Sequence, residues 1–114
     1  MIPSMNRFHG YYSLKAVYSY GKTSRGAFFS IKSLNNPKRR KYRAAVVVSR
    51  KVNKSAVARN KIRRRLYALL REFSADFHQA PDIVITVYSD KVLELNHKKL
   101  SEDLKKQLKQ NNII

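Results

Sequence analysis

One segment of this 114-residue chain places arginine, asparagine and tyrosine side chains at helical spacing, with no acidic residue before Glu72. Guanidinium groups bind phosphate through paired hydrogen bonds, an asparagine amide can reach a base edge or a 2′-hydroxyl, and a tyrosine ring can stack on a base. On a helix these side chains form one stripe opposite the apolar residues. This arginine stripe consists of Arg59, Asn60, Arg63, Arg64, Tyr67 and Arg71. Its chemistry is that of nucleic-acid binding.

The uneven distribution of charge favours the same interpretation. The chain has 25 Lys or Arg against 7 Asp or Glu, a formal net charge of +18, and residues 1–71 contain 19 of the basic residues and no acidic one. Because like charges repel in a compact fold, this stretch indicates an external polyanion, most commonly nucleic acid. The alternative of a solvated helix face would normally show Glu/Lys pairs four residues apart, and none occurs before Glu72.

The residue types argue against catalysis by the polypeptide. The chain has no cysteine, which excludes thiolate nucleophiles and Cys-ligated zinc. Its seven acids are scattered from Glu72 to Asp103, and His9, His78 and His97 belong to separate segments. We therefore predict no catalytic residue and no metal site in the protein. No apolar run approaches the ~20 residues of a membrane span, so we expect a cytoplasmic protein without a membrane partner.

The elements that must position the stripe can be read along the chain. Leu14, Val17 and Tyr18 fall at helical spacing before Gly21, which predicts a short first helix that ends at this glycine. Residues 28–34 alternate as a strand, with Phe29 and Ile31 on one face. A break at 35–37 and a basic loop at 38–41 lead to a β-branched strand at 44–48.

The second half begins with the longest helical pattern. Asn53 and Ser55 are candidate N-caps, and apolar residues recur at helical spacing as far as Phe77. A buried strand at 83–88, a turn at 89–95 and a third helix capped by Asn96 follow. The order is α-β-β-α-β-α, with room for one more short strand near 22–25. We predict a single-domain α+β sandwich over residues 1–114.

Two adjacent motifs resemble a known family. The segments RAAVVVSRKV at 43–52 and AVARNKIRR at 56–64 are similar to the signature of the bacterial ribonuclease P protein subunit: a strand ending in Ser-Lys-Lys, a turn, and Arg-Asn at a fixed offset. The flanking elements agree over nearly the whole chain. Residues 1–6 match nothing in particular and are expected to be flexible. In the family pattern Arg-Glu stands where this chain has Tyr67 and Ala68.

The resemblance implies a fold and a function. The fold is a sheet of about four strands with three helices, α-β-β-β-α-β-α, and a left-handed crossover between its two parallel strands. The function is that of an accessory subunit of ribonuclease P, which binds a catalytic RNA and the 5′ leader of precursor tRNA during endonucleolytic removal of the leader. Catalysis would belong to the RNA, with magnesium bound mainly by the RNA.

The resemblance also assigns residues to two surfaces. For the catalytic RNA they are Arg50, Lys51, Arg59, Asn60, Arg63, Arg64 and Tyr67. For the leader they are Leu14, Tyr18, Phe28, Ser30 and Lys32, where Leu14 and Tyr18 replace two phenylalanines of the family. An aromatic ring, small groups and a charge on one surface suit single-stranded RNA. Phe28 is equally compatible with a core position, and a core position in the first helix is the alternative for Tyr18.

A ribosomal or general RNA-binding protein without an enzymatic role is the alternative function. Such a protein would share the charge and the aromatic strands, but it would have no reason to carry Arg-Asn at this distance from Ser-Arg-Lys. A DNA-architectural protein would be expected to offer symmetric dimer helices or a minor-groove arm, and the sequence has neither.

Overall fold

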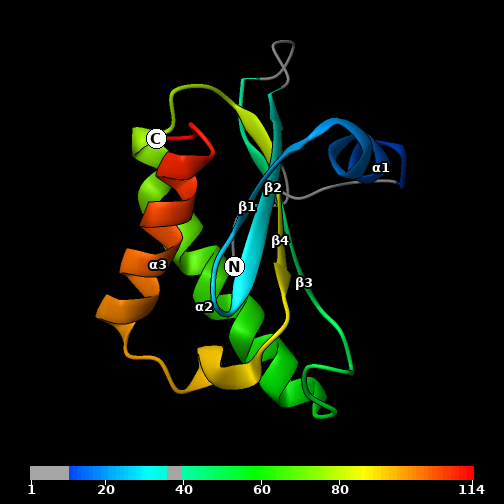
Figure 1. Cartoon of the computed structure of the whole chain (residues 1–114), viewed down its shortest axis with the longest axis vertical. Helices are drawn as coiled ribbons and strands as arrows, with labels where there is room; N and C mark the ends of the chain where they lie inside the picture. The colour runs from blue at the N-terminus through cyan, green and yellow to red at the C-terminus, as the bar shows by residue number, and fades with distance from the viewer. Residues whose placement is uncertain (1–10, 36–39) are drawn as a thin grey trace.

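The computed structural model describes residues 11–35 and 40–114, with side chains from Lys15 onward. These residues form one four-stranded sheet that is covered by helices on both faces (Figure 1). The order along the chain is α1 (Tyr11–Tyr20), β1 (Lys22–Arg25), β2 (Phe29–Asn35), β3 (Arg43–Val48), α2 (Ala56–Phe73), β4 (Pro81–Val87) and α3 (His97–Gln110), with short 3-10 turns η2 (Ser74–Asp76) and η3 (Asp90–Leu93). The predicted α+β class, the extra strand at 22–25 and the three helices are confirmed. Segment 1–6, predicted to be flexible, lies outside the described residues.

The strand order in the sheet is β1-β2-β4-β3. β1 pairs with β2 and β2 pairs with β4 in antiparallel fashion, whereas β3 pairs with β4 in parallel. A parallel pair needs a crossover connection, and α2 supplies it between β3 and β4. The predicted parallel pair is therefore confirmed, and the left-handed sense of the crossover stays a prediction.

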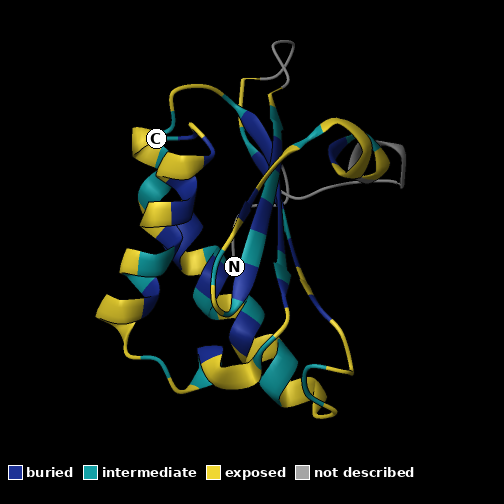
Figure 2. Ribbon diagram, in the orientation of Figure 1, coloured by how far each residue is buried: buried dark blue, intermediate teal, exposed yellow. Residues whose placement is uncertain are grey.

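The main core lies between the sheet and the pair α2 and α3. Alternate residues of the strands face these helices, which contribute leucines and an isoleucine that are fully buried, as the dark blue inner faces in Figure 2 show. The core side chains include Phe29, Ile31, Val46, Ile83, Ile85, Ile62, Leu66, Leu70, Leu100, Leu104 and Leu108. α1 packs on the opposite face of the sheet, where Val17 is fully buried.

Several boundaries differ from the predicted ones. α2 ends at Phe73, not near Phe77, because the chain tightens into η2 at Ser74. Phe77 nevertheless packs edge-on against Tyr42, with ring centroids 5.2 Å apart. β4 begins at Pro81, since a proline without an N–H is tolerated at the first residue of a strand. Tyr88, predicted inside this strand, lies beyond its end and is half-exposed.

Gly21 ends α1 as predicted, and the structure gives a steric reason. A Cβ at this position would lie 2.4 Å from the Val17 carbonyl oxygen and 3.0 Å from that of Ser33. Both atoms are backbone and cannot move aside cheaply, so only glycine allows the chain to pass from α1 into β1 here.

Candidate nucleic-acid interface

The helix that carries the arginine stripe is positioned by its apolar side and by its N-terminal cap. Ile62, Leu66, Leu69 and Leu70 are buried against the sheet, which turns the opposite side of α2 to solvent. Ser55 is the N-cap, because its hydroxyl accepts a hydrogen bond from the Ala58 N–H at 3.2 Å. The other predicted cap, Asn53, instead accepts from the Ser55 N–H at 2.9 Å and fixes the entry to the helix.

The stripe does not present all its members equally. Asn60, Arg64 and Arg71 are exposed, while Arg59, Arg63 and Tyr67 are only partly accessible. In the described part of the chain, Arg64 has no hydrogen-bond or ion-pair partner. Arg63 donates a hydrogen bond to the Asn60 side-chain oxygen one turn away. The exposed groups that remain are therefore chiefly the Arg64 and Arg71 guanidinium groups and the Asn60 amide.

Arg59 lies at the junction between α2 and the preceding loop. Its guanidinium donates to the carbonyl oxygens of Asn53 and Lys54, at 2.9 and 3.0 Å. These bonds hold the loop that carries Arg50 and Lys51, both of which are exposed. The structure thus joins the two predicted basic segments through Arg59, which acts at least partly by ordering the loop.

Tyr67 has a structural contact that the sequence did not reveal. β3 is an outer strand of the sheet, and the Tyr67 hydroxyl accepts a hydrogen bond from the Val46 N–H at 3.0 Å. The ring packs against the main core. Tyr67 therefore fastens the stripe to the edge strand and protects part of an edge that would otherwise face solvent.

Arg65, which is not a member of the stripe, holds another loop. Its guanidinium donates to the carbonyl oxygens of Val92 and Leu95, the latter at 2.6 Å. This connection ties α2 to η3 and to the turn before α3. Its two partners lie about 30 residues away along the chain, so local spacing could not indicate the role.

Two ionisable groups near the beginning of β3 have shifted pKa values. The hydrogen bond to Asp82 raises the pKa of Arg43, against the opposing effect of burial. The pair is buried and bidentate, with nitrogen–oxygen distances of 2.8 and 2.7 Å. Burial raises the pKa of Tyr42, and the charge of Arg71 partly offsets that rise. Arg71 thus extends the stripe towards the beginning of β3.

The predicted leader residues fall on the other face of the sheet, beside α1. Ser30 and Lys32 alternate with the buried residues of β2, and the Lys32 ammonium donates to the Tyr18 carbonyl oxygen at 2.5 Å. Tyr18 itself is 44% exposed, whereas its neighbour Val17 is fully buried. Tyr18, Ser30 and Lys32 form the α1–β2 surface. Leu14 belongs to α1, but its side chain lies outside the described residues.

The placement of Phe28 with Ser30 and Lys32 is wrong. Phe28 precedes β2 and lies in the β1–β2 turn, in which the Gly26 N–H donates to the Phe29 carbonyl oxygen at 3.0 Å. Side-chain alternation therefore does not extend to Phe28, and its ring packs against the main core on the α3 side. The core alternative holds for this residue.

The described side chains contain no group of three or more His, Cys, Asp or Glu that could hold a metal ion. His78 and His97 lie in different segments, and His9 lies outside the described residues. No helix between residues 11 and 35 or between 40 and 114 combines the length and apolarity that crossing a bilayer requires.

Comparison with known proteins gives consistent matches. The family model described as Ribonuclease P matches residues 2–112. The ribonuclease P protein component of a Pseudanabaena species is 34% identical over 105 residues, covering 92% of this chain and 90% of the relative. That of Thermus brockianus is 36% identical over 94 residues, covering 82% of this chain and 53% of the relative.

Solved structures agree in fold. A Staphylococcus aureus RNase P protein mutant with defective mRNA degradation activity superimposes with a TM-score of 0.84 at 21% identity, covering 96% of this chain and 91% of the other. The Thermotoga maritima RNase P protein gives 0.73 at 22% identity, covering 89% and 90%. At these identities the likeness establishes the shared architecture.

Proposed function

Because the chain belongs to the ribonuclease P protein family, and is thus a protein component of the endoribonuclease that acts in tRNA 5′ processing, we propose that it binds the ribonuclease P RNA through α2. The observation that carries this proposal is the arginine stripe beside the outer strand β3, continued by Arg50 and Lys51 through the loop that Arg59 orders. The segment that contains this whole surface, residues 1–71, has no acidic residue. RNA phosphates would neutralise this surface, with release of counterions.

The catalytic centre is assigned to the RNA. The polypeptide neutralises phosphate charge and positions the ribonuclease P RNA and the precursor tRNA. None of its side chains takes part in bond cleavage. The magnesium ions of the reaction are assigned to the RNA as well. The described residues do not fit a magnesium site of their own, because no three carboxylate or imidazole groups gather among them. The proposed location is the cytoplasm, where precursor tRNA is available.

The α1–β2 surface is the proposed site for the single-stranded leader of precursor tRNA. An exposed Tyr18 ring can stack on an unpaired base, and the Lys32 ammonium adds a positive charge beside it. The small side chain of Ser30 leaves room for the RNA strand on this surface. Phe28 is not part of this proposal, because its ring lies on the other face.

The alternative of a ribosomal or general RNA-binding protein is not favoured. The matching family model and the curated relatives are ribonuclease P components.

The test is reconstitution. A bacterial ribonuclease P RNA is incubated with 5′-labelled precursor tRNA at low magnesium, with and without the purified protein. We expect cleavage at the mature 5′ end only when RNA and protein are both present. Cleavage at this position by RNA-free protein would overturn the assignment of catalysis to the RNA. Failure of the protein to stimulate the RNA would overturn the proposed function.

A further inference from the structure

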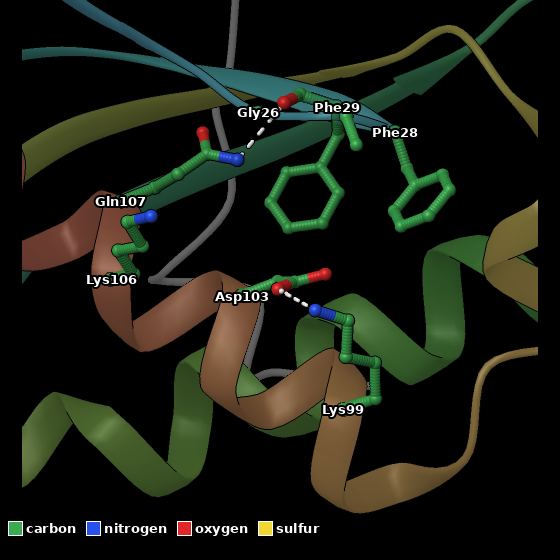
Figure 3. A pocket seen from close by; sticks show the side chains of 8 residues that line it. Gly26, Phe28, Phe29, Lys99, Asp103, Lys106 and Gln107 are labelled. Carbon is green, nitrogen blue, oxygen red and sulfur yellow. Dashed lines mark hydrogen bonds and ion pairs between the residues drawn. The ribbon is translucent and has the colours of Figure 1, made fainter.

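A cavity of about 300 Å³ lies between the β1–β2 turn and α3. Its walls come from two segments far apart in the sequence, as Figure 3 shows: Gly26 and Phe28 from the turn, and Lys99, Asp103, Lys106 and Gln107 from α3. None of these residues belongs to the arginine stripe or to the α1–β2 surface. The volume is at the lower end of the range of small-molecule sites, about 300–1,000 Å³.

The turn supplies an aromatic wall. The Phe28 ring projects towards α3 and is only partly buried, so one part of it remains available for contact. The part of an aromatic ring that borders a cavity can hold a planar group by stacking.

The wall beside the ring contains a buried amide. Gln107 is 3% exposed, and its side-chain N–H donates to the Phe29 carbonyl oxygen at 3.0 Å. Its Oε1 is buried without a hydrogen-bond partner among the described residues. A Cβ on Gly26 would lie 2.2 Å from the Gln107 amide nitrogen, so the glycine is needed for this close approach.

The charges at the mouth favour an anion that also has hydrogen-bond donors. Lys99 and Asp103 form an ion pair at 3.0 Å, and their side chains are 54% and 23% exposed. Lys106 is exposed on the same side of α3. In residues 72–114, five of the six lysines belong to α3, so the basic residues of this otherwise balanced half gather on one helix.

We propose that this cavity is a nucleotide-binding site that prefers guanine. The base stacks on Phe28, the phosphate is held by Lys106, and the Asp103 carboxylate, which Lys99 pairs with, accepts hydrogen bonds from the base. Guanine is favoured because its Watson–Crick edge offers two adjacent N–H donors, which match the two oxygens of a carboxylate. Uracil offers one N–H between two carbonyl oxygens, which a carboxylate would repel.

The proposal does not depend on the function assigned to α2 or α1, because the site lies on other elements. The nucleotide is either free or an unpaired residue of an RNA chain, since both present the same base and phosphate.

The test is a titration of the isotope-labelled full chain, followed by NMR, with GMP, UMP or inorganic phosphate. We expect saturable shifts at Gly26, Phe28 and Lys106 with GMP, and affinity about a hundredfold weaker with UMP if two charge-assisted hydrogen bonds are lost. Inorganic phosphate that binds as tightly as GMP, or shifts that do not saturate, would overturn the site.

Two substitutions on α3 form a matched pair. Lys106→Ala should weaken GMP binding about tenfold if it removes a charge-assisted contact to phosphate. Lys105→Ala removes the same charge from the neighbouring exposed position, which does not line the cavity, and should have little effect. Equal losses would show that only the net charge of α3 matters, and the proposal would be wrong.

Asp103→Asn tests the base specificity. The amide presents one oxygen and one NH₂ group, so the preference for GMP over UMP should disappear while the spectrum of the folded protein is kept. An unchanged preference would overturn the role of the carboxylate.

Binding of a short RNA with one guanosine among uridines then distinguishes an RNA residue from a free nucleotide as the natural ligand. If the RNA binds more tightly than GMP and Lys106→Ala weakens both equally, the ligand is an RNA residue. If the RNA binds more weakly than GMP, the ligand is a free nucleotide.

Discussion

The hydroxyl of Tyr67 on α2 accepts a hydrogen bond from the backbone N–H of Val46 on β3, at 3.0 Å. The bond connects the centre of the arginine stripe to the outer strand of the sheet. It ties α2 to β3 one helical turn from Arg64 and two turns from Asn60. A residue first assigned to RNA contact thus has a role in aligning the surface.

Tyr67→Phe should lower the free energy of unfolding by about 1 kcal/mol, because the Val46 N–H loses its acceptor while the ring still packs. Denaturant unfolding followed by circular dichroism measures this change. Affinity for the ribonuclease P RNA should stay nearly constant under conditions in which the variant is folded. Unchanged stability combined with weaker RNA binding would mean that the hydroxyl contacts the RNA instead.

Arg64 and Arg65 are adjacent in sequence but should behave differently when truncated. Arg64→Ala removes an exposed guanidinium and should weaken RNA binding by about 1–3 kcal/mol without changing stability. Arg65→Ala removes the donors to the Val92 and Leu95 carbonyl oxygens, and should lower stability by about 1–3 kcal/mol.

Filter binding and thermal unfolding of the two variants separate these effects. Lys105→Ala, which removes one exposed positive charge from α3, is the control for net charge. If Arg64→Ala and Lys105→Ala weaken RNA binding equally, the stripe is not the binding surface.

Residue spacing was sufficient to predict the elements, because burial of one face dictates their periodicity. The leucines of α3 and the alternating residues of β2 are buried as expected. Asn96 caps α3 as predicted, since its side chain accepts from the Lys99 N–H at 2.8 Å. These features depend on neighbours within a few residues and are therefore visible in the sequence.

The features that could not be predicted depend on distant partners. The contacts of Tyr67 with Val46 and of Arg65 with Leu95 join residues about 20–30 positions apart. Phe28 was misplaced because the turn at Gly26–Phe29 interrupts the alternation before β2 begins. The position of a turn within one residue decides which face a side chain takes, and composition alone does not determine it.

Asp82→Asn should destabilise the fold by about 3 kcal/mol, because it disrupts a buried bidentate ion pair. Asp82 and Arg43 are register partners at the beginning of the parallel strands β4 and β3. The hydrogen bond to Asp82 raises the pKa of Arg43. Arginine is protonated even without such a partner, so Asp82→Asn leaves the buried guanidinium charged but without the Asp82 carboxylate.

Thermal unfolding of Asp82→Asn and of Asp76→Asn compares their melting temperatures. Asp76→Asn is the control, because it changes an exposed carboxylate. Equal melting temperatures for the two variants would contradict a stabilising role for the pair. Replacement of both Arg43 and Asp82 by apolar residues should cost less than the single change, since no charge is then buried.

Tyr18 and Tyr20 offer a direct test of the leader surface. Both are exposed on α1, 44% and 80%, but Tyr18 lies beside Lys32, whose ammonium donates to the Tyr18 carbonyl oxygen. Tyr18→Ala should weaken binding of precursor tRNA to the assembled complex by about 1–3 kcal/mol if one stacked base is lost. Mature tRNA, which has no leader, should bind with unchanged affinity. Competition binding of the two tRNAs measures the difference.

Tyr20→Ala serves as the matched control, because it removes the same ring from the same helix at a position that is 80% exposed. A core role for Tyr18 would predict a lower melting temperature and parallel losses for both tRNAs. We expect neither, since Tyr18 is 44% exposed, whereas Val17 is fully buried. The single change is preferable to a double change with Lys32, because loss of the Lys32 ammonium would also release the end of α1. Equal effects of Tyr18→Ala and Tyr20→Ala on precursor tRNA would remove the α1–β2 surface as the leader site.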